Sequence, residues 1–222
     1  MINFVRASGN SGCTSSGNTS SIAPPWGAIT PGNAAAYLIF DFSAANTLLS
    51  VTDNAAGVTN AYSITGTFNL SSIAGLSGSA ALACCPRVQG SPTRLDANWT
   101  NPSGGAVSQV NEYSGVASVG TLLTPTAQAA ATSFSQAIAD AIANSVVLSG
   151  IWYPTGPITP GSGFSLRSNS AGTGCASEDQ LFAAPGGTVN MTWNDAVSEA
   201  VVIGGLVLAP ASRQGISPYY FT

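Results

Sequence analysis

Residues 30–42 read TPGNAAAYLIFDF and contain the signal that decides the fold. The Thr, Pro, Gly and Asn that begin this stretch favour a turn. The apolar residues that follow alternate only imperfectly with polar ones, as in a strand that is buried on both faces for part of its length. We therefore predict a buried β-strand over Ala36–Phe42.

Similar short runs, each bounded by Gly, Pro, Asn or Asp, recur along nearly the whole chain. Their spacing is typical of a β-sandwich or barrel. No linker and no repeat divides the chain, so residues 1–210 are predicted to form a single domain. The other predicted strands are Ile2–Arg6, Ser20–Ala23, Leu48–Asp53, Ala61–Asn69, Ala80–Val88, Leu95–Thr100, Val107–Tyr113, Val146–Tyr153, Ser165–Ser168, Asp179–Ala183, Thr188–Trp193 and Ala200–Leu208.

One stretch departs from this pattern. Residues 127–144, AQAAATSFSQAIADAIAN, are rich in Ala and carry apolar side chains at helical spacing. They predict a short surface helix. The alternative is a long loop with a fragment of strand near Thr132–Ala137.

The composition limits the partners of the protein. The chain has 222 residues, of which 45% are apolar, so it can bury a sizeable core. Only 6% of the residues are charged and the net charge is −4. The basic residues are scattered arginines without the basic stripe that phosphate neutralisation requires, which excludes nucleic acid as a partner. They are Arg6, Arg87, Arg94, Arg167 and Arg213.

Most enzyme classes are excluded as well. Without His or Lys, the chain cannot form a Ser-His-Asp triad, a Cys-His pair or a Schiff base. Paired carboxylates, as in glycosidases, are the remaining option. Glu112 is the best candidate, but Asp53 and Asp179 come from separate elements with no spacing signature. We expect Glu112 to accept hydrogen bonds from backbone or Tyr groups at a strand end, and we expect no catalytic residue and no cofactor.

Two acidic pairs, Asp53-Asn54 and Glu178-Asp179, offer oxygen atoms of the kind that Ca²⁺ prefers. Neither pair has the dense alternating acids of a calcium loop. A β-turn accounts better for the first pair and a strand entry for the second, so no metal site is predicted.

The four cysteines permit three disulfide pairings if all are oxidised. Cys84 and Cys85 are neighbours on a predicted strand, so their side chains point to opposite faces and are expected to be buried free thiols. Cys13 and Cys175 lie in Gly/Ser-rich loops, where a disulfide can join the N-terminal loop to the later half of the chain.

The N-terminal residues Met1–Arg6 lead into Ser, Gly and Asn without an apolar stretch of signal-peptide length. The longest apolar run, Ala34–Phe40, is far shorter than a membrane span. We expect a protein that binds no membrane, is assembled in the cytoplasm of a host and is released with a particle.

Five segments share their order and character with a known family: Val51–Asn54 with Gly57 and Tyr62, Asn111–Val116, Gly161–Arg167, Glu178–Gln180 and Gly187–Trp193. Together they resemble phage-associated β-sandwich domains of virion structural proteins, which have a jelly-roll, concanavalin-like topology. The most specific segment is NEYSGV at residues 111–116. The resemblance implies an all-β, antiparallel jelly-roll β-sandwich with at most one short helix.

The resemblance also implies a structural role in a virion, above all as a capsid decoration or cement protein that binds the major capsid protein at capsomer boundaries. The low charge agrees, because large permanent interfaces are depleted in charged residues. Edge strands such as Ile2–Arg6 carry little charge, which predicts self-association as a trimer or dimer. The alternative is a glycan-binding receptor module of a tail or fibre, with Trp26, Trp99, Trp152 and Trp193 as candidate stacking platforms.

The C-terminal segment, residues 211–222, follows the last predicted strand and contains three consecutive aromatic residues. Pro218 lacks an amide hydrogen and cannot extend a strand easily. We predict an arm in which Tyr219, Tyr220 and Phe221 anchor the protein to a neighbouring subunit or the capsid, with Arg213 at the rim. The alternative is that the segment folds back over its own sandwich.

Overall fold

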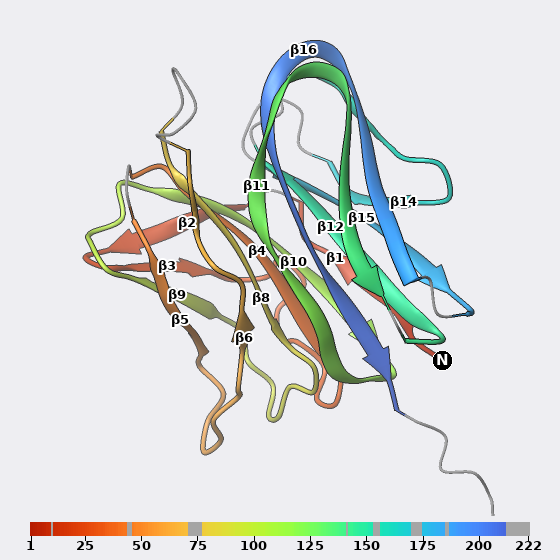
Figure 1. Ribbon diagram of the computed structural model, residues 1–222. Coiled ribbons are helices and arrows are strands. Elements are labelled where there is room, and N and C mark those ends of the chain that lie inside the picture. The colour runs from red at the N-terminus through yellow and green to blue at the C-terminus, as the bar shows by residue number, and fades with distance from the viewer. Residues whose placement is uncertain are drawn as a thin grey trace, which may run out of the picture.

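The computed structural model describes residues 1–9, 11–43, 46–70, 77–140, 142–152, 156–169, 175–184 and 187–211. Most of these residues form antiparallel strands in two sheets (Figure 1). The strands are β1 (Asn3–Ala7), β2 (Ser11–Ser16), β3 (Thr19–Ile22), β4 (Ala34–Asp41), β5 (Leu48–Asp53), β6 (Ser63–Ile64), β7 (Phe68–Asn69), β8 (Ser79–Cys85), β9 (Leu95–Trp99), β10 (Ala106–Ser114), β11 (Val116–Asp140), β12 (Ser145–Trp152), β13 (Ile158–Pro160), β14 (Ser165–Ser168), β15 (Cys175–Phe182) and β16 (Gly187–Pro210).

The first sheet has ten strands, and β4 lies near its centre between β8 and β10. Strand β4 pairs with β10 from Ala34 opposite Tyr113 to Asp41 opposite Ala106. Every residue of β4 is buried. The buried strand predicted over Ala36–Phe42 is therefore confirmed, apart from its last residue, Phe42, which is exposed and follows the strand.

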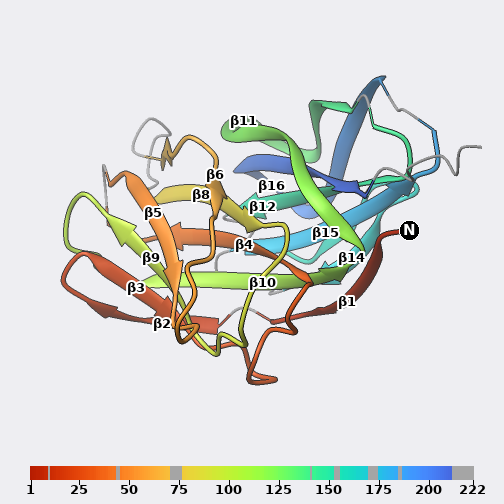
Figure 2. The same ribbon diagram turned by 90° about the horizontal axis from the view of Figure 1, so that it is seen from below.

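Strand β4 is buried on both faces because the first sheet curls over itself on one side and packs against the second sheet on the other. Figures 1 and 2 show β3, β5 and β9 on one side of β4 and β10, with β12 and β16 on the opposite side. Tyr37 and Ile39 belong to the core between β4 and the curled part of its own sheet. Leu38 and Phe40 belong to the core shared with the second sheet.

The second sheet has six strands in the order β11-β16-β12-β15-β14, with β13 beside β16. Strands β11 and β16 are long and bend together, so that Figure 1 shows them as an arch. The C-terminal half of β11 and the N-terminal half of β16 fold over the face of β12 that points away from the first sheet. A third apolar core lies beneath them, with Phe134, Ile138 and Trp193 packed near Val147 and Ile151.

The short helix predicted within residues 127–144 is wrong for the residues that the structure describes there. Residues up to Asp140 belong to β11 and pair with β16, with Phe134 opposite Trp193 and Ile138 opposite Val189. Phe134 and Ile138 are four residues apart, a spacing that places two side chains on one face of a strand as well as of a helix. The wider prediction of an all-β, antiparallel sandwich is confirmed, because no described element is a helix.

Close approach of the arch to β12 requires a glycine in β16. A Cβ on Gly205 would collide with Sδ of Met191 and would lie 3.0 Å from the Leu148 carbonyl oxygen. Gly115, at the turn between β10 and β11, has a φ of 76°, and a Cβ there would collide with the carbonyl oxygen of Met1. The backbone of Met1 therefore lies directly against this turn.

Candidate functional site

A pocket of about 320 Å³ lies at the edge of the sandwich, where β1 and β14 are the outer strands of the two sheets. We call it the edge notch. Its apolar and aromatic residues come from β1 and the residue before it, and from β10, β12 and β15; Leu181 among them is 47% exposed. The lining residues are Ile2, Asn3, Phe4, Tyr113, Val146, Arg167, Asp179 and Leu181.

The floor of the edge notch is a closed polar network. The Tyr113 hydroxyl donates to Oδ2 of Asp179 at 2.7 Å, and Nε of Arg167 donates to Oδ1 of Asp179 at 2.8 Å. The Arg167 guanidinium also lies 4.2 Å from the ring centroid of Phe4. Burial, followed by the Asp179 charge, raises the pKa of Tyr113 well above its ordinary value. These contacts join β10, β14 and β15 where the edges of the two sheets meet.

The chain returns to the edge notch at the end of β16. Pro210 lies opposite Val116, and Leu208 lies opposite Val146, which lines the notch. Figures 1 and 2 both show the end of β16 close to the N-terminus. The predicted partner-binding residues Arg213, Tyr219, Tyr220 and Phe221 lie outside the described residues, so their role stays a prediction. The last described strand, β16, ends at Pro210 near the notch.

Glu112 organises a loop. Its carboxylate accepts hydrogen bonds from Arg6 Nε at 2.6 Å, from Asn33 Nδ2 at 2.7 Å and from the Thr30 amide at 3.0 Å. Burial alone would raise the pKa of Glu112, but the hydrogen bonds from Asn33, Thr30 and Arg6 outweigh burial and hold the pKa below its ordinary value. Arg6 in turn lies over the Trp26 ring at 4.8 Å. The predicted backbone hydrogen bond is present, from Thr30, but the side-chain donors among the described residues are Arg6 and Asn33 and not a tyrosine. Glu112 thus ties β10 to the loop before β4.

The acidic pair Asp53-Asn54 stabilises a turn. Asp53 accepts hydrogen bonds from the Ala55 amide at 3.0 Å and from the side chains of Asn60 and Tyr62 at 2.8 Å each. Among the residues that the structure describes, no group of three or more Cys, Asp or Glu side chains is placed to hold a metal ion.

Glu178 and Asp179 face opposite sides of β15, so they do not form a paired site. Asp179 belongs to the edge notch, whereas Glu178 is buried on the other face and accepts a hydrogen bond from the Gly161 amide at 3.0 Å. Burial raises the pKa of Glu178 to about 8. Its other carboxyl oxygen, Oε1, is buried and has no hydrogen-bond partner in the described part of the chain.

The four cysteines are free thiols in the structure. Cys13 packs against the core inside the curled first sheet, and Cys175 lies in the core between the two sheets. The disulfide considered between them is therefore not formed here, because the first sheet separates the two thiols.

Three of the four tryptophans fill cores and are not surface platforms. Trp99, Trp152 and Trp193 are each at most 1% exposed, and Trp99 and Trp193 donate their indole hydrogens to serine hydroxyls. Trp26 is half-buried beneath Arg6. Glycan stacking on the first three would require the sandwich to open.

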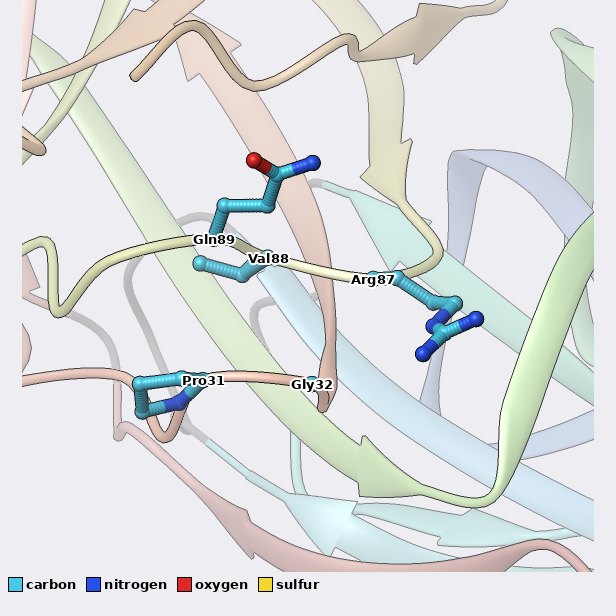
Figure 3. Close-up of a pocket in the computed structure, with 5 residues that line it drawn as sticks. All are labelled: Pro31, Gly32, Arg87, Val88 and Gln89. Atoms are coloured by element: carbon cyan, nitrogen blue, oxygen red, sulfur yellow. The ribbon is translucent and has the colours of Figure 1, made fainter. Parts of the chain in front are cut away.

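A second pocket, of about 480 Å³, lies between the loop that precedes β4 and the loop that follows β8. Figure 3 shows Arg87 extending from its loop on the side of Gly32, and the Gln89 carboxamide extending on the opposite side. We call this the loop pocket; it is lined by Pro31, Gly32, Arg87, Val88 and Gln89. Sequence reasoning missed it because no local pattern shows which arginine finds an acidic partner.

Comparison with known proteins gives no match: no family model, no curated protein and no solved structure is similar to this chain. Among the described residues, no helix is long and apolar enough to cross a membrane.

Proposed function

We propose that this protein is a non-catalytic structural protein that binds other subunits through the edge notch. The supporting observation is the convergence of the notch, the N-terminal strand and the end of β16 at one edge of the sandwich. The carboxylates described above hold loops and sheet edges together. The exposed part of Leu181 and the apolar notch around it remain available for burial against a partner.

In this proposal the C-terminal segment supplies the main contact. Tyr219, Tyr220 and Phe221 provide apolar area, of which each large side chain contributes roughly 1.5–3 kcal/mol when buried. Arg213 provides a polar contact at the rim. The segment starts beside the notch of its own chain and engages a neighbouring copy, which gives a trimer or dimer.

The test of self-association is sedimentation of the full chain, of a variant truncated after residue 211, and of Leu181→Asp. Leu49→Asp is the matched control, because Leu49 is an exposed leucine of β5, in the curled part of the first sheet. We expect the truncated variant and Leu181→Asp to be monomers, and we expect Leu49→Asp to associate like the full chain. A monomeric wild-type protein at micromolar concentration, or association that survives Leu181→Asp, would contradict the proposal.

The finer proposal is that the assembly is a phage particle, which the protein decorates by binding the major capsid protein after synthesis in the host cytoplasm. It is supported by the sequence resemblance and by the low charge, which suits permanent interfaces. Cryo-electron microscopy of purified particles tests it. Density for the sandwich on the head lattice supports decoration, density at the tail tip supports the glycan-binding alternative, and absence from particles contradicts both.

A further inference from the structure

The C-terminal half of β11 is an edge of the second sheet. Strand β11 stands first in the order β11-β16-β12-β15-β14, and within the described part of the chain it pairs with β16 only. Residues 133–140 pair with residues 187–194 of β16 without a register shift. No described residue outside β16 forms a backbone hydrogen bond with residues 133–139, which we call the open edge. A regular strand with such a row of outer N–H and C=O groups is a template for pairing with another chain.

The other edge strands that the structure describes are blunted against such pairing. Strand β1 carries Arg6, β5 carries Asp53 and β14 carries Arg167. Strands β6 and β7 have two residues each, and β13 has three residues and ends at Pro160. Charge, proline and short length all hinder pairing at a sheet edge.

The same contrast exists within β11. The half that precedes the open edge contains Pro125 and five register shifts against β16, and its Thr124 hydroxyl accepts a hydrogen bond from the Gly66 amide at 3.1 Å. The open edge has no proline, no register shift and no charged residue. It is also held in place, because Oε1 of Gln136 accepts a hydrogen bond from the Thr126 hydroxyl at 2.8 Å. The open edge is therefore ordered and unprotected.

We infer that the open edge pairs with the open edge of a second copy of this chain, antiparallel and about a two-fold axis at Gln136. In this register Phe134 lies opposite Ile138 of the second copy, and Ser135 lies opposite Ala137 of the second copy. An aromatic side chain opposite a β-branched one is a favourable cross-strand pair. The outer face presents only small, exposed side chains, so it places no bulky group in the way of a neighbouring strand.

Charge favours a second copy as the occupant. Self-pairing places each residue opposite a residue of the same segment, so an edge with charges of one sign would repel itself. The open edge has none. The adjacent Asp140 lies outside the paired residues, and its carboxylate accepts hydrogen bonds from the Ser145 hydroxyl and the Ile142 amide of its own chain. A two-fold contact also satisfies the outer backbone groups of both copies at once.

This contact goes beyond the proposed notch contact and does not replace it. Seven residues with mostly small side chains bury little apolar area, so we expect a dissociation constant of about 1 mM. At micromolar concentration the open edge alone leaves the chains monomeric. Where the notch holds copies together in an assembly, the local concentration is high and edge pairing links neighbouring copies.

The experiment is a dilution series of the full chain with Leu181→Asp, from about 1 mM to about 20 µM, followed by the amide resonances of residues 133–139. The Leu181→Asp substitution removes the proposed notch contact, so the two interfaces are measured separately. Two variants in this background test the register. One combines Ser135→Lys with Ala137→Lys, and its matched control combines Ser135→Lys with Ala137→Glu at the same two exposed positions. Equal thermal unfolding of the two variants verifies that both are folded.

We expect the resonances of the open edge to shift with concentration in Leu181→Asp. The lysine–glutamate variant should associate about tenfold more tightly than the lysine–lysine variant, because position 135 lies opposite position 137 of the second copy twice in each pair. Higher salt should reduce this difference.

Resonances that do not respond to concentration would mean that the open edge has another occupant or none, and would overturn the inference. Equal association of the two charged variants, or tighter association of the lysine–lysine variant, would also overturn it. The comparison of the two variants is valid whether or not Leu181→Asp is monomeric at micromolar concentration. Failure of the notch proposal and failure of this inference are therefore distinguishable.

Discussion

The Asn60 side chain pairs with the backbone of Gln89 as a neighbouring strand would. Its Nδ2 donates to the Gln89 carbonyl oxygen at 3.0 Å, and its Oδ1 accepts from the Gln89 amide at 2.7 Å. The same Nδ2 donates to Asp53 at 2.8 Å. One side chain thus connects the loop after β5 to the loop after β8 and keeps both positioned at the loop pocket.

Replacing Asn60 by Ala should destabilise the protein by about 1–3 kcal/mol, because backbone groups of Gln89 lose their partners. Urea unfolding measures the change. Asn194→Ala is the control, since Asn194 is exposed on β16 and its side chain makes no hydrogen bond to the described residues; its effect should stay within about 0.5 kcal/mol. Equal stability of the two variants would show that the Asn60 bonds are dispensable.

The buried carboxyl of Glu178 should make the stability of the protein fall as the pH rises. Its pKa is about 8 in the folded protein, against an ordinary value of 4.5. The folded state therefore favours the protonated form, and stability is lost as the pH rises from about 4.5 towards 8. The loss amounts to roughly 3 kcal/mol at pH 7.

Glu178→Gln should remove this part of the pH dependence, because glutamine stays neutral while its carbonyl still accepts from the Gly161 amide. Urea unfolding of both proteins between pH 5 and 8 measures the two slopes. The advantage of the variant over wild type should grow with pH. Parallel stability curves would mean that Glu178 ionises without cost.

Gly205→Ala should destabilise the protein by about 1–3 kcal/mol, because the new methyl group collides with Met191 beneath the arch. Thermal unfolding measures the effect. Gly9→Ala is the matched control: a Cβ at Gly9 meets no atom within 4 Å. If both variants unfold at the wild-type temperature, the arch must be able to move away from β12.

The native thiols should react slowly with a thiol reagent. Cys84, Cys85 and Cys175 are buried, and burial raises the pKa of these thiols and of Cys13, so little thiolate is present at neutral pH. All four thiols should react once the chain is unfolded in the absence of reductant. A count of two under these conditions would reveal a disulfide.

Most strands of the first sheet were predictable because their signals are local, but β2 (Ser11–Ser16) was not predicted, and the strand predicted over Ala61–Asn69 is two short strands, β6 and β7. Apolar runs end at turn residues, as at Gly32 before β4, and this pattern does not depend on what packs against the strand. Residues 127–140 were mispredicted because the deciding information is distant. Phe134 and Ile138 suit a helix or a strand, and pairing of residues 127–140 with residues 187–202 selects the strand.

The site was less predictable than the fold. The hydrogen-bonding role of Glu112 follows from its residue type and its place on a strand. The edge notch, by contrast, joins Phe4, Tyr113 and Arg167, which are far apart in the sequence and meet only when two sheet edges align. The loop pocket likewise lies between two loops that only the three-dimensional arrangement brings together.

Burial of β4 on both faces has a consequence for how its register is chosen. In a strand with one solvent-exposed face, a register shift of one residue moves the apolar side chains into water and is strongly disfavoured. A slip of β4 would exchange Tyr37 and Ile39 with Leu38 and Phe40 between two dry cores, so water exposure would distinguish the registers poorly. Hydrogen bonds of polar groups at the two ends of β4 must then distinguish the correct register from a shifted one. At one end, Asp41 accepts from Nδ2 of Asn46, and the backbone of Asn46 exchanges hydrogen bonds with the Ser79 hydroxyl on β8. At the other end, Glu112 on β10 accepts from the loop just before β4. These bonds hold β4 in its register against both neighbouring strands.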